Sequence, residues 1–171
     1  IRPGDAIIGI ASSGAHSNGY SLIRKIIERA GAKPSENIEG KTLQEWVMAP
    51  TQIYVKQLLN VMARHPLKGL AHITGGGLVD NIPRVLPENT QAVLRRDSWT
   101  MPPLFRWLQM KGGVADAEMV RVFNCGIGMV VVVDQQEAKA VIASIEQQGL
   151  NAWLLGDITQ RPHGAPQTIL I

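Results

Sequence analysis

Apolar and polar positions along the 171-residue chain follow two patterns: continuous apolar runs, and segments in which apolar residues recur every three or four positions. Short apolar runs bounded by polar or glycine-rich segments are typical of buried strands. The clearest run is Met129–Asp134, with the sequence MVVVVD. Together the runs predict strands over residues 5–12, 67–74, 90–95, 129–134 and 152–158, with 168–171 as a candidate last strand.

Helical spacing marks most segments between these runs. Residues 20–30 carry apolar side chains at this spacing, and Gly31 ends the predicted helix. A second amphipathic helix is predicted over 135–148, ending at Gly149. The other predicted helices are 43–48, 53–64 with Thr51 as N-cap, 78–85, one opened by Pro102 and Pro103, and 116–123 with Asp116 as N-cap, while 32–42 is predicted as a polar connection.

Helices and strands are mixed along the chain, and no internal repeat, low-complexity tract or linker interrupts them. This order predicts a single domain over residues 1–171 of the α+β class, an α/β sandwich with a mixed β-sheet and helices. Three polar segments that contain glycine, at 13–19, 74–77 and 124–128, fall at predicted strand ends. Because sheets covered by helices bind ligands at strand ends, we expect these segments to converge on one edge of the sheet.

Composition narrows the classes of function. Apolar residues make up 45% of the chain and charged residues 18%, a balance typical of globular domains. The net charge of +3 raises the question of nucleic acid, but the basic residues are scattered, and only two Phe and two Tyr could stack on bases. No apolar run approaches the roughly 20 residues that cross a membrane. We therefore expect no nucleic acid and no membrane as a partner, and the positive charge suits an anionic small molecule.

The single cysteine, Cys125, excludes an internal disulfide and a cysteine-rich metal site, and it suits a cytoplasmic protein. No activating base is evident for its thiol, so we expect a structural residue. The first residues, Ile1–Asp5, contain neither an initiator Met nor an apolar signal segment. We therefore expect a chain cut from within a longer protein.

The first candidate site is the loop Ser13–Gly19, between a predicted strand and a predicted helix. Its small residues let a ligand approach the backbone, and the helix start presents unpaired N–H groups that suit an anion. Ser17 or Asn18 as a helix cap, with Asn18 and Gly19 as a turn, explains the same pattern without a ligand. Neither a cap nor a turn requires His16, although an isolated loop histidine is also common at protein surfaces.

The second candidate is the run Gly75, Gly76 and Gly77, between a predicted strand and a predicted helix. Such a run forms either a nest of N–H groups around phosphate or a tight structural turn. It is not a Walker motif, since no Gly-Lys-Ser/Thr follows, and it lacks the spaced glycines of dinucleotide sites. His72 lies inside the preceding strand, where a buried, hydrogen-bonded histidine is the simpler interpretation. A third small-residue turn, Asn124–Gly128, enters the clearest strand.

Four segments resemble, in the same order, the signatures of the aminoimidazole ribonucleotide synthetase family. They are Gly14–Arg24, Ala49–Lys56, Ala71–Gly77 followed by Asn81–Pro87, and Phe123–Met129. The resemblance runs over essentially all 171 residues, and the ordered combination is far more specific than any one segment.

The resemblance implies the C-terminal domain of a two-domain enzyme, with a mixed sheet that is partly ferredoxin-like and an N-terminal ATP-binding half that is absent here. The same fold is implied for formylglycinamidine synthetase, thiamine-monophosphate kinase, selenophosphate synthetase and a hydrogenase-maturation protein. The implied reaction closes formylglycinamidine ribonucleotide to aminoimidazole ribonucleotide with ATP, in purine biosynthesis. The resemblance also implies that the full-length protein is a homodimer, that its active site lies in a cleft between two domains, and that carboxylates of the absent half hold Mg²⁺. We therefore predict no metal ligand here and no activity of the fragment alone.

The resemblance also implies roles for the loops. His72 and His16 are candidates for proton transfer or for stabilising the charge that develops on phosphate. The substrate-binding candidates are Ser13, Gly14, Ser17, Asn18, Gly19, Thr74, Gly75, Gly76, Gly77 and Asn124. For Thr51 and Lys56 a structural role is the simpler interpretation.

Two alternatives stay open. The first is another ATP-using member of the superfamily, of the formylglycinamidine synthetase, thiamine-monophosphate kinase or selenophosphate synthetase type, although Tyr20-Ser21-Leu22 and Ile82-Pro83-Arg84 favour the cyclo-ligase. The second is a non-catalytic basic domain that binds RNA or a protein, which binding to polyanions with a steep salt dependence would support.

Overall fold

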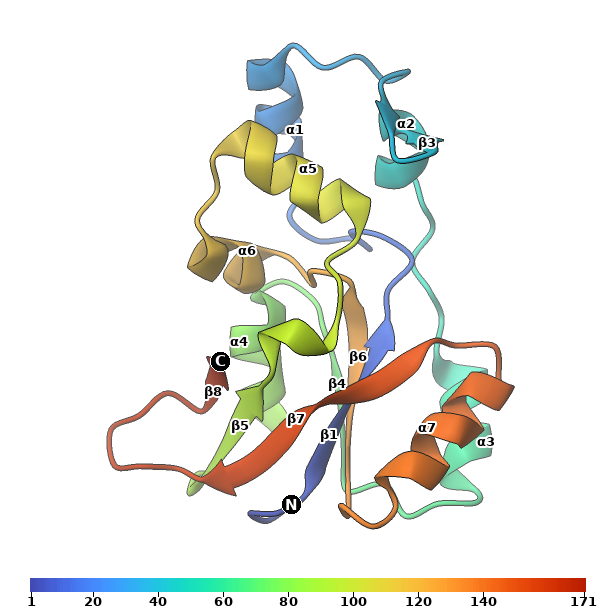
Figure 1. Cartoon of the computed structure of the whole chain (residues 1–171), viewed down its shortest axis with the longest axis vertical. Helices are drawn as coiled ribbons and strands as arrows, with labels where there is room; N and C mark the ends of the chain where they lie inside the picture. The colour runs from blue at the N-terminus through green and yellow to red at the C-terminus, as the bar shows by residue number, and fades with distance from the viewer.

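A mixed six-stranded sheet forms the centre of the computed structural model, which describes all 171 residues (Figure 1). The strand order is β4-β6-β1-β7-β5-β8, and all neighbours are antiparallel except the parallel pair β5 and β8. The strands are β1 (Ala6–Ala11), β4 (Gly69–His72), β5 (Thr90–Leu94), β6 (Ile127–Val133), β7 (Ala152–Gln160) and β8 (Thr168–Leu170). The predicted α+β class, the mixed sheet and every predicted strand are confirmed.

Seven α-helices and two short 3₁₀ helices surround the sheet. They are α1 (Tyr20–Ala30), α2 (Leu43–Val47), α3 (Val55–Met62), α4 (Gly77–Asn81), η1 (Ile82–Val85), η2 (Arg96–Ser98), α5 (Pro103–Gly112), α6 (Asp116–Val122) and α7 (Ala138–Gln147). The predicted helix over 78–85 is split into α4 and η1, because Pro83 cannot continue the helical hydrogen bonding. No helix has both the length and the apolar character that a membrane crossing requires.

Three sequence-based details are wrong. A hairpin of β2 (Asn37–Ile38) and β3 (Lys41–Thr42) lies within 32–42, because two-residue strands are too short to show alternation. Two predicted N-caps are also wrong. Tyr54 rather than Thr51 occupies the N-cap position of α3, and Ala115 rather than Asp116 that of α6.

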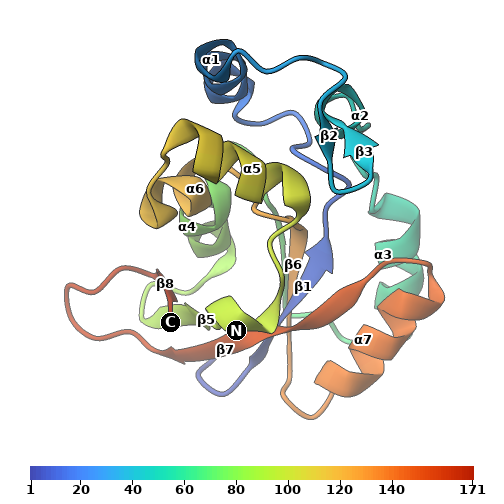
Figure 2. The same ribbon diagram turned by 45° about the horizontal axis from the view of Figure 1, so that its top comes forward.

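Three separate apolar cores stabilise the arrangement. Alternate residues of β1 point to opposite faces of the sheet, so Ile8 packs with α3 and α7, while Ile7 packs with α4 and η1. The third core joins α1, α2, α5 and α6 and lies beyond one end of the sheet, as Figure 2 shows. A cap of helices therefore faces this end of the strands.

The antiparallel register of β1, β6 and β4 decides which loops meet. The C-terminal ends of β1 and β4 and the N-terminal end of β6 all lie at the edge that faces the helical cap. The loops that leave or enter there are 12–19, 73–77 and 123–126. The predicted convergence of the three segments that contain glycine is therefore confirmed.

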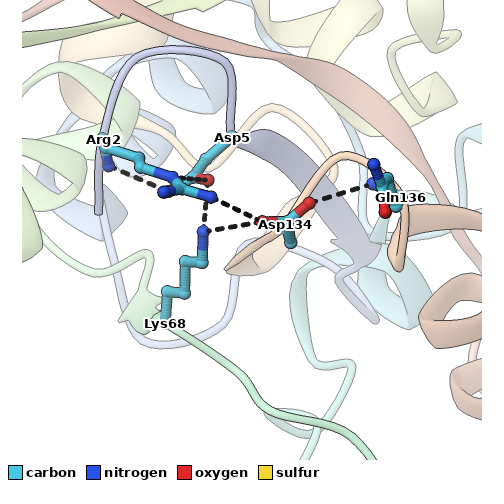
Figure 3. Close-up of polar contacts among 5 residues, drawn as sticks. All are labelled: Arg2, Asp5, Lys68, Asp134 and Gln136. Atoms are coloured by element: carbon cyan, nitrogen blue, oxygen red, sulfur yellow. Dashed lines mark hydrogen bonds and ion pairs between the residues drawn. The ribbon is translucent and has the colours of Figure 1, made fainter.

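The opposite ends of the same strands carry a charged network (Figure 3). Asp5, just before β1, is buried and accepts hydrogen bonds from the backbone N–H of Arg2 at 2.8 Å and from the ammonium group of Lys68, just before β4. Lys68 also contacts Asp134, just after β6, at 3.3 Å, and the exposed guanidinium of Arg2 reaches Asp134 at 3.2 Å. These hydrogen bonds hold the pKa of Lys68 above its ordinary value. The network ties the three strands together at the end away from the loops.

Candidate functional site

Asn124 joins two of the three loops. Its side-chain nitrogen donates to the carbonyl of Gly14 at 2.9 Å, and its side-chain oxygen accepts from the Ser12 hydroxyl at 3.1 Å and from the N–H of Gly126 at 2.8 Å. The residue has no exposed surface. The expectation that Asn124 contacts substrate is therefore corrected: its polar atoms are occupied by the protein, and it holds the loops in register.

His16 is buried beneath its own loop. Its side chain is 3% exposed, and its backbone has a φ of 55°, which is uncommon outside glycine. Its Nε2 accepts from the N–H of Ser13 at 3.2 Å, so the neutral ring carries its proton on Nδ1, which has no hydrogen-bond partner. Burial, and then the neighbouring His72, lower the pKa of His16 to about 4. A surface role for His16 is excluded, and the ring is neutral at pH 7.

His16, His72 and Tyr54 form a triangle of rings. The ring centroids lie 6.4 Å apart for the two histidines, and those of Tyr54 lie 6.2 Å from His16 and 6.3 Å from His72. His72 is exposed at the end of β4, not buried as the simpler interpretation expected. The Tyr54 hydroxyl donates to the Ala11 carbonyl at 2.7 Å, and burial raises its pKa.

Tyr54 was not among the predicted site residues, although it lies in the family-like segment 49–56. A second signal for it is Gly128, at the start of β6. A Cβ there would lie 1.9 Å from the Tyr54 hydroxyl and 2.7 Å from the His16 ring, so glycine is required for the two rings to meet. This contact crosses three segments of the chain, so the local pattern could not reveal it.

The three glycines of the second loop have different environments. Gly76 and Gly77 have φ values of 96° and 57°, whereas Gly75 does not have a positive φ. A Cβ on Gly77 would lie 2.0 Å from the Val120 carbonyl oxygen, so this buried residue serves packing against α6. Gly75 is exposed, and the nearest atom to a Cβ there is the Asn18 side-chain oxygen at 3.9 Å. The first and second loops therefore face each other at Asn18 and Gly75.

Backbone donors collect at this meeting point. The N-cap of α1 is Gly19, with a φ of 73°, no side-chain cap and no acidic residue in the first turn, so capping by Ser17 or Asn18 is wrong. Across from it, the N–H groups of Gly75 and Gly76 donate to no protein acceptor. An uncapped helix start opposite free N–H groups is an arrangement that attracts an anion.

The serines of the first loop hold an extended strap, residues 48–53, beside this site. The Ser13 hydroxyl donates to the Pro50 carbonyl at 2.6 Å, and the hydroxyls of Ser17 and Thr51 lie 3.4 Å apart. A cavity of about 400 Å³ lies between His16 and the strap. A neighbouring groove of about 420 Å³ runs along α3 past Tyr54 and His72. The candidate site is thus open to solvent on both sides of the strap. Lys56 lines neither the cavity nor the groove.

The residues present do not fit a magnesium site. No group of three or more His, Cys, Asp or Glu side chains is placed to hold a metal ion. Cys125 is fully buried, and burial raises the pKa of its thiol to about 12, which agrees with a structural role. No step that uses a metal or a thiolate therefore follows from this chain.

Comparison with known proteins agrees with the motifs. A family model described as AIR synthase related protein, C-terminal domain, matches residues 2–169. The phosphoribosylformylglycinamidine cyclo-ligase of Bordetella petrii is 57% identical over 173 residues, which cover 100% of this chain and 50% of that protein. The chain therefore spans about half the length of the curated relatives it matches.

Solved structures share the fold at low identity. The hydrogenase maturation protein HypE in complex with ATP superimposes with a TM-score of 0.64 at 18% identity, over 99% of this chain and 48% of that chain. Thiamine-monophosphate kinase from Stenotrophomonas maltophilia gives a TM-score of 0.60 at 15% identity, over 99% and 50%. Since the family model matches almost every residue and a relative is 57% identical, the chain belongs to the AIR synthase related proteins, as their C-terminal domain.

Proposed function

We propose that this chain supplies one wall of the active site that closes formylglycinamidine ribonucleotide to aminoimidazole ribonucleotide with ATP. The 57% identity to a cyclo-ligase over the whole chain supports this reaction. ATP phosphorylates the formamide oxygen, the amidine nitrogen attacks the activated carbon, and phosphate leaves as the imidazole ring closes. Because nucleophile and electrophile belong to one molecule, holding the substrate in the reactive conformation supplies much of the rate.

The observation that carries the proposal is the facing pair of N–H clusters at Gly75 and at the start of α1. We assign them to a phosphate group of the substrate or nucleotide, because both present donors without protein acceptors. Asn18 and Thr74 lie beside the clusters and can orient the substrate amide. Ser13 and Ser17 hold the strap against the loop, so their role is to shape the site.

The two histidines have different assignments. His16 is neutral, and its only proton lies on Nδ1, which is buried without an acceptor, so we assign its N–H dipole to stabilising negative charge that develops nearby rather than to direct contact with the substrate. His72 is exposed at the site and is assigned to proton transfer. Tyr54 holds the space between the rings through its bond to Ala11.

The remaining parts of the enzyme belong to the proposal as well. An N-terminal half contributes the ATP site with its Mg²⁺ and the other wall of the cleft, which agrees with relatives of about twice this length, and the full-length protein is a cytoplasmic homodimer. The binding of ATP by a protein of the same fold is consistent with this assignment. The isolated chain is inactive, because it contains no cluster of acidic side chains for the metal.

Steady-state kinetics of the full-length protein test the proposal. We expect release of ADP that depends on formylglycinamidine ribonucleotide, and no such release by the 171-residue chain alone. His72→Ala should lower kcat by about 10²–10⁴-fold, the usual contribution of a proton-transfer group. The control is His163→Ala, which removes an exposed histidine outside the site and should leave kcat unchanged. Turnover of thiamine monophosphate or selenide instead, or native kcat in His72→Ala, would contradict the proposal.

A further inference from the structure

Asn81, the last residue of α4, is directed back at the glycine loop. It is 2% exposed. Its side-chain nitrogen contacts the carbonyl oxygens of Thr74 at 3.2 Å, Gly75 at 3.2 Å and Gly77 at 2.7 Å, and its side-chain oxygen accepts from the Thr74 hydroxyl at 3.0 Å. The two N–H bonds of this buried amide are shared among the three carbonyls on the side that faces the protein interior, and the N–H of Gly77 also donates to the Thr74 carbonyl at 3.0 Å.

These contacts determine where the loop's N–H groups point. In a planar trans peptide, the C=O and the following N–H point in opposite directions. Asn81 and the N–H of Gly77 together hold the Thr74 carbonyl inward, so the N–H of Gly75 points away from the interior. Asn81 alone holds the Gly75 carbonyl inward, and the N–H of Gly76 therefore points outward as well. Both N–H groups indeed lack protein acceptors.

We propose that Asn81 is a positioning residue for phosphate binding: by holding the carbonyls of the triple-glycine loop inward, its amide directs the N–H groups of Gly75 and Gly76 to a phosphate group. The proposal rests on the proposed function, which assigns phosphate to these donors. It adds a residue that does not itself touch the ligand.

Two observations favour this role: the helix is anchored without Asn81, and the charge beside the loop is negative. Leu78 and Ile82 are fully buried in the core on this face of the sheet, so α4 is already anchored without Asn81. A Cβ on Gly76 would lie 2.8 Å from the carboxylate of Asp80, so a negative charge borders the loop. A phosphate bound there would therefore depend on directed N–H groups rather than on general positive potential.

The first experiment measures the direction of the loop amides without ligand. The chain is labelled with ¹⁵N at glycine, and residual dipolar couplings of Gly75 and Gly76 are compared between the native chain and Asn81→Ala. The control is Thr90→Ala, which removes an equally buried side chain whose hydroxyl donates to the Pro87 carbonyl at 2.7 Å. We expect the couplings to change in Asn81→Ala and to stay native in Thr90→Ala. Native couplings in Asn81→Ala would overturn the proposal, whatever happens to activity.

The second experiment titrates the same samples with inorganic phosphate and follows the two glycine resonances. We expect the Kd of Asn81→Ala to rise by about tenfold or more, because two hydrogen bonds to a charged group are misdirected. Thr90→Ala should bind phosphate as the native chain does, even if its Tm falls equally. A native Kd in Asn81→Ala would overturn the proposal.

Failure of the proposed function gives a different result. If phosphate moves neither glycine resonance in the native chain, the phosphate contact is wrong for both proposals, while the couplings still decide whether Asn81 directs the loop. If Asn81→Ala does not fold, Asn81→Ser replaces it, because a hydroxyl is compatible with the polar surroundings but too short to reach all three carbonyls. The same couplings and the same Kd then support or overturn the proposal.

Discussion

Strands β4, β6 and β1 carry the candidate site at one end and a charged network at the other. At the network end, Asp5, Lys68 and Asp134 each contact a group of opposite charge. At the site end, the Nδ1–H of His16 is buried without a partner, and the N–H groups of Gly75 and Gly76 have no acceptor. The same strands therefore end in satisfied polar groups on one side and in unsatisfied ones on the other.

Backbone conformation shows the same difference. Three non-glycine residues have a positive φ, and two of them, His16 and Cys125, lie in the loops at the site end. Such conformations cost about 1–3 kcal/mol each and persist only where the surroundings enforce them. The comparison indicates that the network end and the apolar cores stabilise the domain, while the site end carries strain and unsatisfied donors suited to a ligand.

The largest expected effect separates packing from binding within the glycine loop. Gly77→Ala should lower the free energy of unfolding by about 3 kcal/mol or more, because its Cβ would collide with the Val120 carbonyl and its φ is positive. Gly75→Ala should have the native free energy of unfolding, since the nearest atom to its new Cβ is the Asn18 side-chain oxygen at 3.9 Å. Urea unfolding of both variants measures the difference, and equal losses would show that the loop is one structural turn.

Gly76 lies between these cases. Gly76→Val in the full-length protein should reduce turnover more than its stability accounts for, because a β-branched residue adopts a φ of 96° only with strain and would displace the N–H groups. The expected loss of stability is about 1–3 kcal/mol. Tm and kcat are measured on the same sample. Native values of both would remove the loop from the active site.

The network end should stabilise the folded chain mainly through its buried residue, Asp5. Asp5→Ala should cost about 2–3 kcal/mol, because it leaves Lys68 and the N–H of Arg2 without their buried acceptor. Arg2→Ala should cost less than about 1 kcal/mol, since that side chain is largely exposed and its ion pair is screened by solvent. The comparison would fail if the two variants unfolded at the same denaturant concentration.

As the pH falls, the free energy of unfolding should decrease first through His16 at the site end, and only at lower pH through Asp134 at the network end. The pKa of His16 is lower in the folded state than its ordinary 6.5, so the unfolded chain binds this proton more readily, and stability falls as the pH drops from 6.5 to about 4. Asp134 has a lowered pKa, first through the N–H of Gln136 and then through Lys68, so its contribution is lost only below about pH 4. The urea concentration at the unfolding midpoint should fall between pH 7 and pH 4 in the native chain, and should fall less in His16→Asn. An equal fall in both proteins would show that another group causes the pH dependence.

The smallest effect concerns Tyr54. Tyr54→Phe should cost about 0.5–1.5 kcal/mol, because the Ala11 carbonyl loses its hydrogen bond while the ring remains. The full-length variant should lose kcat more than KM changes, if the ring triangle positions the histidines. Equal kcat with lower Tm would leave Tyr54 a structural residue.

Local patterns in the sequence predicted the elements well. The helix predicted over 20–30 is found as Tyr20–Ala30. The strand predicted over 129–134 is found as β6, which begins two residues earlier and ends one residue earlier. These elements depend on periodicity and on helix-ending glycine, which neighbouring residues determine. The position of the three polar segments at predicted strand ends likewise predicted correctly that they meet at one edge of the sheet.

The roles within the loops could not be predicted in the same way. Asn124 contacts Gly14 across 110 residues of sequence, and Tyr54 contacts Ala11 across 43. Whether a polar side chain meets a ligand or another loop depends on the register of β1 with β6, which no local pattern encodes. The sequence therefore predicted that the loops converge, but it assigned Asn124 to the ligand and omitted Tyr54 from the candidate site.

The burial of Cys125 has a practical consequence. With its pKa raised to about 12, only on the order of 10⁻⁵ of this thiol is deprotonated at pH 7, and the residue has no exposed surface. Maleimide and iodoacetamide reagents attack exposed thiolates, so the native chain should stay unlabelled. A cysteine introduced at exposed Ser13 or Ser17 would then carry a fluorophore or spin label alone. The chain is thus ready for distance measurements across the strap without first removing its own cysteine.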